Sequence, residues 1–197
     1  MSGLPERASV VVIGAGIVGN SVAYHLSRLG WRDVVLLDKG PLPSPGGSTG
    51  HASNFIYLVD HSKEMTKFTV ESVRQYKELG VFTQSGGIEV ARTRERAEEL
   101  KRRIASAKSW GVEPVDLLTP AEVRKLIPFI NEDVILSGFS TSGVGVVDSL
   151  QAGTLMRQRA QETGALTVSA STEVTAIDVA DGRIARVRTD RGDVQAD

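Results

Sequence analysis

The sequence of 197 residues contains no cysteine, which excludes disulfides, iron–sulfur clusters and a cofactor attached through cysteine within this chain. A reducing compartment is therefore the default expectation: the cytoplasm, or the mitochondrial matrix if the protein is eukaryotic. An excess of positive charge is also missing, since 23 Lys and Arg stand against 24 Asp and Glu. This balance speaks against nucleic acid or an anionic membrane surface as a partner.

Long apolar runs are absent too. None approaches the roughly 18 residues that a membrane-spanning helix needs, and residues 1–9 are short and polar, unlike a secretory signal. Of the three histidines, His25 and His61 have no partner at metal-ligand spacing, so no metal site is expected. The remaining composition, 41% hydrophobic and 24% charged, is typical of soluble globular protein, with enough length for one domain and part of another.

The most informative stretch runs from Val10 to Asp38. An apolar run over residues 10–13 leads directly into Gly14-Ala15-Gly16-Ile17-Val18-Gly19, and apolar residues then recur at helical spacing up to Gly30. A second apolar run, residues 34–37, ends on Asp38. The order of strand, glycine turn, helix, strand and acid predicts a dinucleotide-binding βαβ unit.

Each part of this motif has a physical role. Gly14 permits the tight turn, Gly16 lets a pyrophosphate approach the backbone, and Gly19 lets the helix pack closely on the strand. The unpaired N–H groups and positive dipole end of the helix face the phosphates. Asp38 is placed to accept hydrogen bonds from the ribose hydroxyls, which argues against a 2′-phosphorylated cofactor.

The segment after Asp38, residues 39–54, is rich in proline and glycine and is predicted to be a loop. Ligands bind where loops follow parallel strands at the carboxyl edge of such a sheet. Gly46 and Gly47 allow close approach, Ser48 and Thr49 offer donors to a phosphate or flavin edge, and His51 lies beside them.

The middle of the chain predicts a second group of elements. A helix over residues 65–79 is expected to pack its face of Met65, Phe68, Ser72, Tyr76 and Leu79 into the core, and Gly80 ends it. Glu89 is expected on a solvated strand face. A charged helix over 94–110 offers a Glu99–Arg103 pair, and Thr119 to Glu122 form a capping box. Residues 134–147 predict strand, turn and strand.

The last fifty residues return to the first pattern. Asp148 caps a helix that extends to about Thr163, and residues 165–168 predict a short buried strand. Residues 173–179 and 184–189 flank Asp181-Gly182, a strong hairpin signal. A third strand begins at Val194. A further apolar strand is expected to follow, so the chain is interpreted as the N-terminal portion of a longer protein.

Together these segments resemble the glycine-oxidase-like (DAO) family of FAD-dependent amine oxidoreductases, in particular the branch of dimethylglycine oxidase, dimethylglycine dehydrogenase and sarcosine dehydrogenase. The segments that carry the resemblance are VVVIGAGIVGNSVAYHLSRLGWRDVVLLDKGPL, PGGSTGHASN, SGGIEVA, AKSWGVE and GVGVVDSLQAGTLMRQRAQETGA. The first is common to many flavoproteins. The Gly-Ser-Thr-x-His loop is much more specific.

The resemblance implies an α/β fold: a Rossmann-type, glutathione-reductase-2-like parallel sheet that binds FAD, with an inserted β-meander and part of a substrate domain. The FAD-binding part would comprise residues 8–80 and 148–197, and the substrate-domain insertion about 81–147. Catalytic residues stay unassigned. In the family, the residues that hold the amine belong to a part of the chain that would follow residue 197 of this sequence. Any tetrahydrofolate-binding region would also lie there.

In this branch the loop histidine carries FAD through a bond to the flavin 8α carbon, which implies covalent attachment at His51. The other implied cofactor contacts are Gly14, Gly16, Ile17, Val18 and Gly19 at the pyrophosphate, Asp38 and Lys39 at the ribose and adenine, Ser48, Thr49, Gly50 and Phe55 along the flavin, and Val174 at the adenine. The run from Gly50 to Asn54 departs from the family pattern. The residues that line the substrate side of the flavin are therefore expected to differ from those of other family members.

The implied function is oxidation of an N-methylated glycine-type amine, dimethylglycine or sarcosine, to an iminium with N-demethylation. One alternative is a deaminating amino-acid oxidase of the same fold, although it would need no histidine in this loop. Another is a non-catalytic regulatory homologue, since the branch resembles a phosphatase regulatory subunit. An NAD-dependent dehydrogenase is a further alternative, but the predicted hairpin after the third strand is more typical of FAD-binding folds. The expected partner is a small-molecule amine, and the oligomeric state is left open.

Overall fold

The computed structural model describes residues 3–44 and 46–196. The predicted domain covers residues 1–197, and its residues 1, 2, 45 and 197 lie outside the described residues. The chain divides into two compact units, Met1–Ser53 with Asp148–Asp197 and Asn54–Val147. The expected boundary near residue 81 differs from this division. Residues 54–80 group with the second unit because β4 (Phe55–Ile56) pairs there with β9 (Gly145–Val147).

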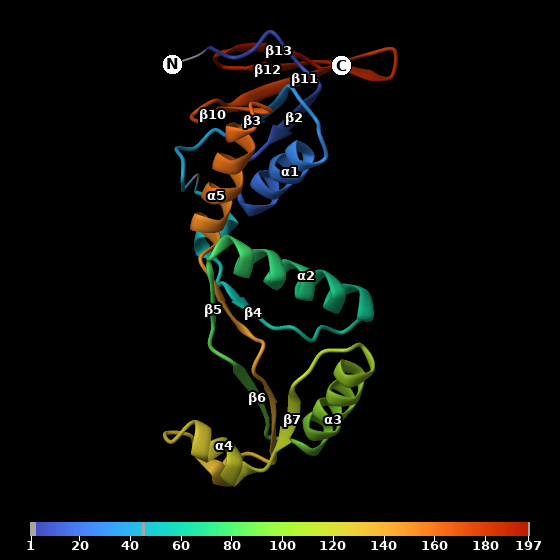
Figure 1. Ribbon diagram of the computed structural model, residues 1–197, viewed down its shortest axis with the longest axis vertical. Coiled ribbons are helices and arrows are strands. Elements are labelled where there is room, and N and C mark those ends of the chain that lie inside the picture. Colours follow the sequence, from blue (N-terminus) through green and yellow to red (C-terminus); the bar gives the residue numbers. More distant parts are fainter. Residues whose placement is uncertain (1–2, 45, 197) are drawn as a thin grey trace. The chain divides into compact units, whose positions relative to one another are not determined.

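A three-stranded parallel sheet in the order β10–β3–β2 forms the centre of the first unit (Figure 1). Its strands are β2 (Val10–Ile13), β3 (Val34–Leu37) and β10 (Leu166–Ser169). The residues of the middle strand, β3, are at most 1% exposed. An apolar run without alternation is typical of a parallel strand that is covered on both faces.

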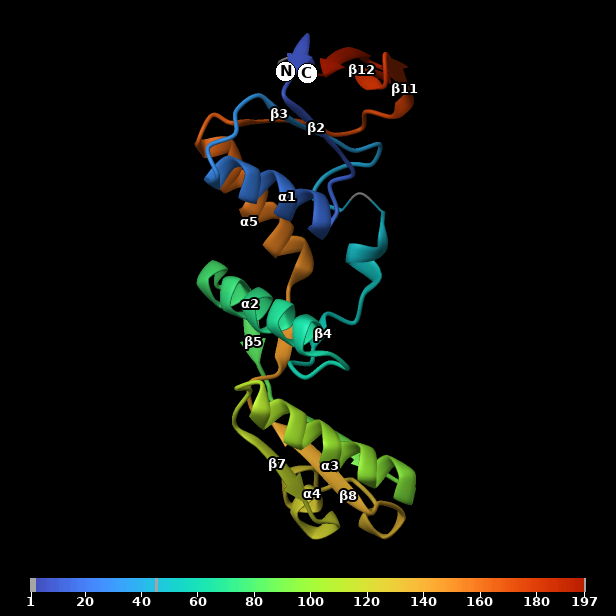
Figure 2. The same ribbon diagram turned by 90° about the vertical axis from the view of Figure 1, so that its right-hand side faces the viewer.

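Two helices cover one face of this sheet. Figures 1 and 2 show α1 (Ile17–Arg28) and α5 (Ser149–Glu162) side by side. Val34 and Leu36 of β3 pack into a cluster with Ala23 of α1 and Ala160 of α5. The predicted βαβ unit and the predicted helix after Asp148 are therefore confirmed.

A β-meander covers the opposite face, where Val35 and Leu37 pack against Val187 and Val194. Its strands are β1 (Arg7–Ala8), β11 (Val174–Ala180), β12 (Arg183–Thr189) and β13 (Gly192–Ala196), in the order β1–β13–β12–β11. The hairpin predicted at Asp181-Gly182 is confirmed. Both residues have positive φ, 51° and 74°, as a tight turn between right-twisted strands requires.

The second unit contains two small antiparallel sheets, β4–β9–β5 and β6–β8–β7. The remaining elements are α2 (Lys63–Leu79), β5 (Phe82–Gln84), β6 (Gly87–Ala91), α3 (Arg94–Ser109), β7 (Val115–Leu118), α4 (Pro120–Leu126), η2 (Glu132–Val134) and β8 (Ser137–Thr141). Its core surrounds the fully buried ring of Phe139. The strand–turn–strand predicted over 134–147 exists, but β8 and β9 join different sheets. β7 was not predicted.

The buried face of α2 differs from the expected one. Met65 and Phe68 are 49% and 68% exposed, while Thr66 and Val73 are buried. The hydroxyl of Thr66 accepts a hydrogen bond from the backbone N–H of Asp60, which holds that side of the helix inward. The prediction that Met65 and Phe68 are core residues is therefore wrong.

Glu89 on β6 belongs to a partly buried ion cluster and does not lie on a solvated strand face. Its carboxylate pairs with Arg96 and Arg103 of α3, and the Arg103 guanidinium also donates to the carbonyl oxygen of Val59 at 2.8 Å. Glu99, the expected partner of Arg103, pairs with Arg96 instead. The side chains of Glu89 and Arg103 are 27% and 15% exposed.

We expect Glu89→Gln to lower the free energy of unfolding by about 2 kcal/mol, because it leaves the Arg103 charge poorly compensated in a partly buried position. Urea denaturation of the variant measures this loss. Glu98→Gln is the matched control on the exposed side of α3, where the pair with Lys101 is open to solvent, and it should leave the midpoint unchanged. Equal effects of the two changes would contradict a structural role for the cluster.

Candidate functional site

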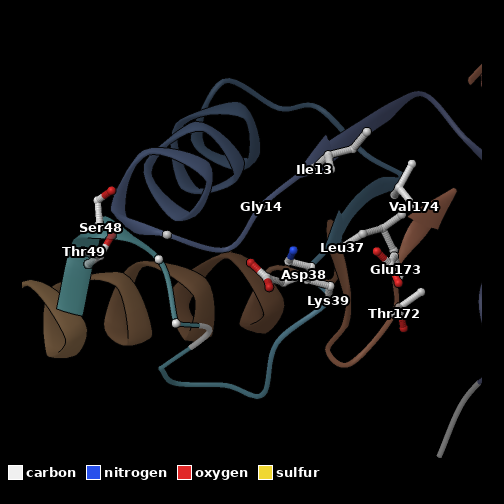
Figure 3. Close-up of a pocket in the computed structure, with 13 residues that line it drawn as sticks. Ile13, Gly14, Leu37, Asp38, Lys39, Ser48, Thr49, Thr172, Glu173 and Val174 are labelled. Atoms are coloured by element: carbon white, nitrogen blue, oxygen red, sulfur yellow. The ribbon is translucent and has the colours of Figure 1, made fainter. Parts of the chain in front are cut away.

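A hollow of about 470 Å³ lies in the first unit at the carboxyl ends of β2 and β3 (Figure 3). It is lined by Ile13, Gly14, Gly16, Leu37, Asp38, Lys39, Gly46, Gly47, Ser48, Thr49, Thr172, Glu173 and Val174. Figure 3 shows Ser48 and Thr49 at one end, Asp38 between, and Glu173 and Val174 at the other end. The hollow therefore connects the glycine turn with the start of the meander.

The glycine turn has the geometry that its sequence predicts. Gly14 adopts a φ of +104° and donates its N–H to the carbonyl oxygen of Leu37 at 2.7 Å, which ties the turn to β3. A Cβ on Gly19 would lie 1.8 Å from the carbonyl oxygen of Gly14, so only glycine allows α1 to come this close. A Cβ on Gly16 would lie 3.0 Å from the Thr49 hydroxyl.

The N-terminus of α1 is not capped by its own N-cap residue, Gly16. The hydroxyl of Thr49, which comes from η1 (Ser48–His51), accepts the N–H of Ile17 at 3.0 Å. The predicted loop thus folds back onto the helix N-terminus. An anion bound here would meet backbone N–H groups, the helix dipole and the hydroxyl of Thr49 together.

Asp38 joins the turn to the loop that follows β3. Its two carboxylate oxygens accept the N–H groups of Ala15 at 2.6 Å and Gly40 at 2.7 Å. A carboxylate offers about four acceptor positions, so two remain for the hydroxyls of a ribose. Lys39 lies next to it in the lining and adds a positive charge.

Four lining residues were not predicted from the sequence: Ile13, Leu37, Thr172 and Glu173. Gly46 and Gly47, which were expected to allow close approach of a ligand, also line the hollow. A signal existed for Ile13 and Leu37, because both end parallel strands and such ends meet at one edge of the sheet. Thr172 gave no signal. Its backbone N–H donates to the carbonyl oxygen of Asp38 at 2.8 Å, which brings the segment before β11 to the hollow.

Seven of the thirteen predicted site residues line this hollow: Gly14, Gly16, Asp38, Lys39, Ser48, Thr49 and Val174. Ile17, Val18, Gly19 and Gly50 are in the surrounding backbone but not in the lining, and the side chain of Val18 is 74% exposed. Phe55 belongs to the second unit, where it lines a different hollow with Gly86 and Gly87.

His51 lies at the end of η1, exposed, and borders a shallow hollow with Gly46, Gly47, Ser48 and Ala52. Its Nδ1 is 3.0 Å from the carbonyl oxygen of Gly47. A carbonyl oxygen can only accept, so Nδ1 carries the hydrogen in this contact and the neutral ring has its lone pair on Nε2. The first hollow and this one share residues 46–48.

The donor set of the first hollow fits a dinucleotide: backbone N–H groups for a pyrophosphate, a carboxylate for a ribose, and apolar side chains around a ring. Across residues 3–44 and 46–196, no group of three or more His, Cys, Asp and Glu side chains is arranged to hold a metal ion. Within the same residues, no helix is both long and apolar enough to cross a membrane.

Comparison with known proteins gives relatives along nearly the whole chain. The mitochondrial pyruvate dehydrogenase phosphatase regulatory subunit of Mus musculus is 31% identical over 98% of this chain and 22% of its own length. Mitochondrial dimethylglycine dehydrogenase of Rattus norvegicus is 33% identical over 82% and 19%. Mitochondrial sarcosine dehydrogenase of Homo sapiens is 33% identical over 98% and 22%. The chain thus spans about a fifth of the length of these relatives.

Among solved structures, L-proline dehydrogenase from P. horikoshii matches with a TM-score of 0.89 and 27% identity, covering 98% of this chain and 52% of that one. The α/β fold predicted from the sequence is confirmed by this match. The family described as FAD dependent oxidoreductase (DAO) matches residues 9–197. The chain therefore belongs to the DAO family of FAD-dependent oxidoreductases.

Proposed function

We propose that this chain forms the cofactor-binding part of an enzyme that oxidises an N-methylated glycine-type amine, dimethylglycine or sarcosine, and removes the methyl group. The observation that carries the proposal is the Gly-Ser-Thr-x-His loop, in which η1 lies beside the dinucleotide hollow and His51 is exposed at its end. The similarity to dimethylglycine and sarcosine dehydrogenases supports the same substrate class.

In this proposal the residues of the first unit hold FAD. Gly14, Gly16 and the backbone of residues 17–19 bind the pyrophosphate, Asp38 and Lys39 the ribose and adenine, and Val174 the adenine. Ser48, Thr49 and Gly50 contact the flavin side. When bound, FAD accepts the hydride equivalent that leaves the N-methyl carbon, and hydrolysis of the resulting iminium gives formaldehyde and the demethylated amine.

His51 is proposed to carry FAD through a bond from its imidazole to the flavin 8α carbon. This bond would replace a C–H bond of the 8α methyl group and the imidazole N–H bond, with loss of two protons, and the two electrons left on the flavin would pass to the same electron acceptor that reoxidises it in turnover. The contact with Gly47 presents Nδ1 as the donor and Nε2 as the nucleophile, and it orients the ring. Thr49 ties η1 to the N-terminus of α1 by accepting the N–H of Ile17, so the loop that contains the histidine is attached to the proposed phosphate-binding turn. No cysteine competes for this attachment.

The domain roles remain proposals as well: FAD binding by residues 8–80 and 148–197, and a substrate-domain portion at about 81–147. Tetrahydrofolate, as an acceptor of the one-carbon unit, would require a region outside this chain. The mitochondrial relatives favour the mitochondrial matrix in a eukaryotic cell, and the cytoplasm is proposed for a bacterial one.

The test is anaerobic addition of dimethylglycine, sarcosine, glycine or L-proline to the purified flavoprotein. Only the N-methylated amines should bleach the oxidised flavin spectrum, and formaldehyde should form with oxygen or an artificial acceptor present. Reduction by glycine or L-proline, or release of ammonia in place of formaldehyde, would favour a deaminating amino-acid oxidase or another member of the family.

A regulatory homologue is the second candidate, favoured by 31% identity to a phosphatase regulatory subunit over 98% of the chain. The intact glycine turn, Asp38 and His51 argue against a degenerate cofactor site. A folded protein that binds no flavin and reacts with no amine would support the regulatory role and contradict the proposed amine oxidation.

A further inference from the structure

A buried arginine is connected to the glycine turn through Asn20 and is not among the residues that line the hollow. Arg157 is in the middle of α5 and is only 8% exposed. Its Nη1 donates to Oδ1 of Asn20 at 3.2 Å. Within the described ranges, 3–44 and 46–196, Arg157 forms no ion pair with a carboxylate. Burial lowers its pKa, yet a guanidinium remains protonated at neutral pH.

Asn20 connects this charge to the turn. It is 3% exposed, and its Nδ2 donates to the carbonyl oxygens of Ala15 at 2.6 Å and Gly16 at 3.0 Å. The orientation of the amide is determined by its neighbours, because only Oδ1 can accept from Arg157 and only Nδ2 can donate to carbonyls. The chain of contacts therefore runs from Arg157 through Asn20 to the two residues at the centre of the turn.

The close contact between α1 and α5 makes this chain possible. A Cβ on Gly153 of α5 would lie 2.9 Å from Nδ2 of Asn20, so glycine leaves room for the amide. A second contact from α5 reaches the same region: the hydroxyl of Ser149 donates to the carbonyl oxygen of Thr49 at 3.0 Å. The glycine turn and η1, which would both face an anion in the hollow, are therefore both held by side chains of α5: the turn by Arg157 through Asn20, and η1 by Ser149.

We propose that Arg157 is a positioning residue for the pyrophosphate. Through Asn20 it holds the carbonyl oxygens of Ala15 and Gly16 on the protein side of the turn, and its charge offsets the negative charge of the phosphates. This inference rests on the proposed dinucleotide site. A buried cation with one neutral partner is costly to the fold on its own account, and an anion in the hollow supplies the compensating charge.

The test uses ADP and adenosine, which differ only in the two phosphates. Variants are made in a His51→Ala background, so that flavin can be removed, and binding is measured by isothermal titration calorimetry. We expect Arg157→Met to weaken ADP binding about tenfold, because the variant removes one positive charge that acts on the phosphates from behind Asn20. Adenosine binding should change less than about twofold, because adenosine carries no charge.

Two further variants make the result specific. Arg157→Gln keeps a hydrogen-bond donor but removes the charge, and it should show the same selective loss even if Arg157→Met folds poorly. Arg159→Met removes an exposed charge from the same helix and should bind ADP as the parent does. Circular dichroism spectra establish that each variant is folded before titration.

Equal weakening of ADP and adenosine in both Arg157 variants would overturn the proposal, because that pattern reports only damaged packing. Unchanged ADP binding would also overturn it. If the parent protein binds neither ligand, the dinucleotide site itself fails. Because neither probe contains a flavin, none of these outcomes depends on the amine that is oxidised or on covalent attachment at His51.

Discussion

Acid precipitation of the His51→Ala variant is expected to release all of its flavin into the supernatant, whereas the unchanged protein should keep its flavin in the pellet. The physical reason is the proposed bond between the His51 imidazole and the flavin 8α carbon. Alanine cannot form this bond, so only the noncovalent contacts of the hollow remain, and acid destroys them. The measurement is the flavin absorbance of both fractions after denaturation.

His61→Ala is the matched control, because His61 is an exposed histidine of the second unit and not part of the dinucleotide hollow. It should leave the flavin in the pellet. Flavin in the supernatant of the unchanged protein would remove the covalent link while leaving the fold intact, and would reopen the deaminating oxidases. Flavin that remains in the pellet of His51→Ala would assign the attachment to another residue.

Gly19→Ala is expected to weaken FAD binding by at least about a hundredfold and to lower the free energy of unfolding by about 3 kcal/mol, because the added methyl group has no room. Its Cβ would lie 1.8 Å from the carbonyl oxygen of Gly14. The turn cannot move aside easily, since Gly14 is hydrogen-bonded to Leu37 at 2.7 Å. Either α1 or the turn must shift, and in the proposed site both would present N–H groups to the phosphates.

Noncovalent FAD retention after gel filtration, in the His51→Ala background, measures the first effect, and urea denaturation the second. Gly3→Ala is the control, because a Cβ there meets no atom within 4 Å. A Gly19→Ala protein with normal FAD affinity and stability would show that close packing of α1 on the turn is not needed for binding.

The sequence alone determined the features that depend on neighbouring residues. The glycine turn, the βαβ order, the Asp181-Gly182 hairpin and the helix caps follow from φ preferences and from hydrogen bonds between residues close in the chain. For the same reason the capping box at Thr119 and the end of α2 at Gly80 were predictable. The resemblance in the loop after Asp38 then indicated the cofactor.

Tertiary structure decided which face of each element is buried and which distant side chains meet. Helical spacing suggested Met65 and Phe68 for the core of the second unit, but packing buried Thr66 and Val73 instead. Glu89 had an alternating strand pattern that predicts exposure, yet α3 packs on this sheet and two of its arginines pair with the Glu89 carboxylate. The spacing of apolar residues within one helix or strand does not show where the element that packs against it lies.

The same limit applies to the site. Asp38 and the glycine turn were predicted because one short motif contains both, whereas Thr172 and Glu173 reach the hollow only through the return of the chain after β10. Asn20 and Arg157 are separated by 137 positions and lie in different segments of the chain, so no local sequence pattern relates them. Their contact exists because α1 and α5 pack on the same face of one sheet, and long-range packing of this kind is the part that the tertiary structure determined.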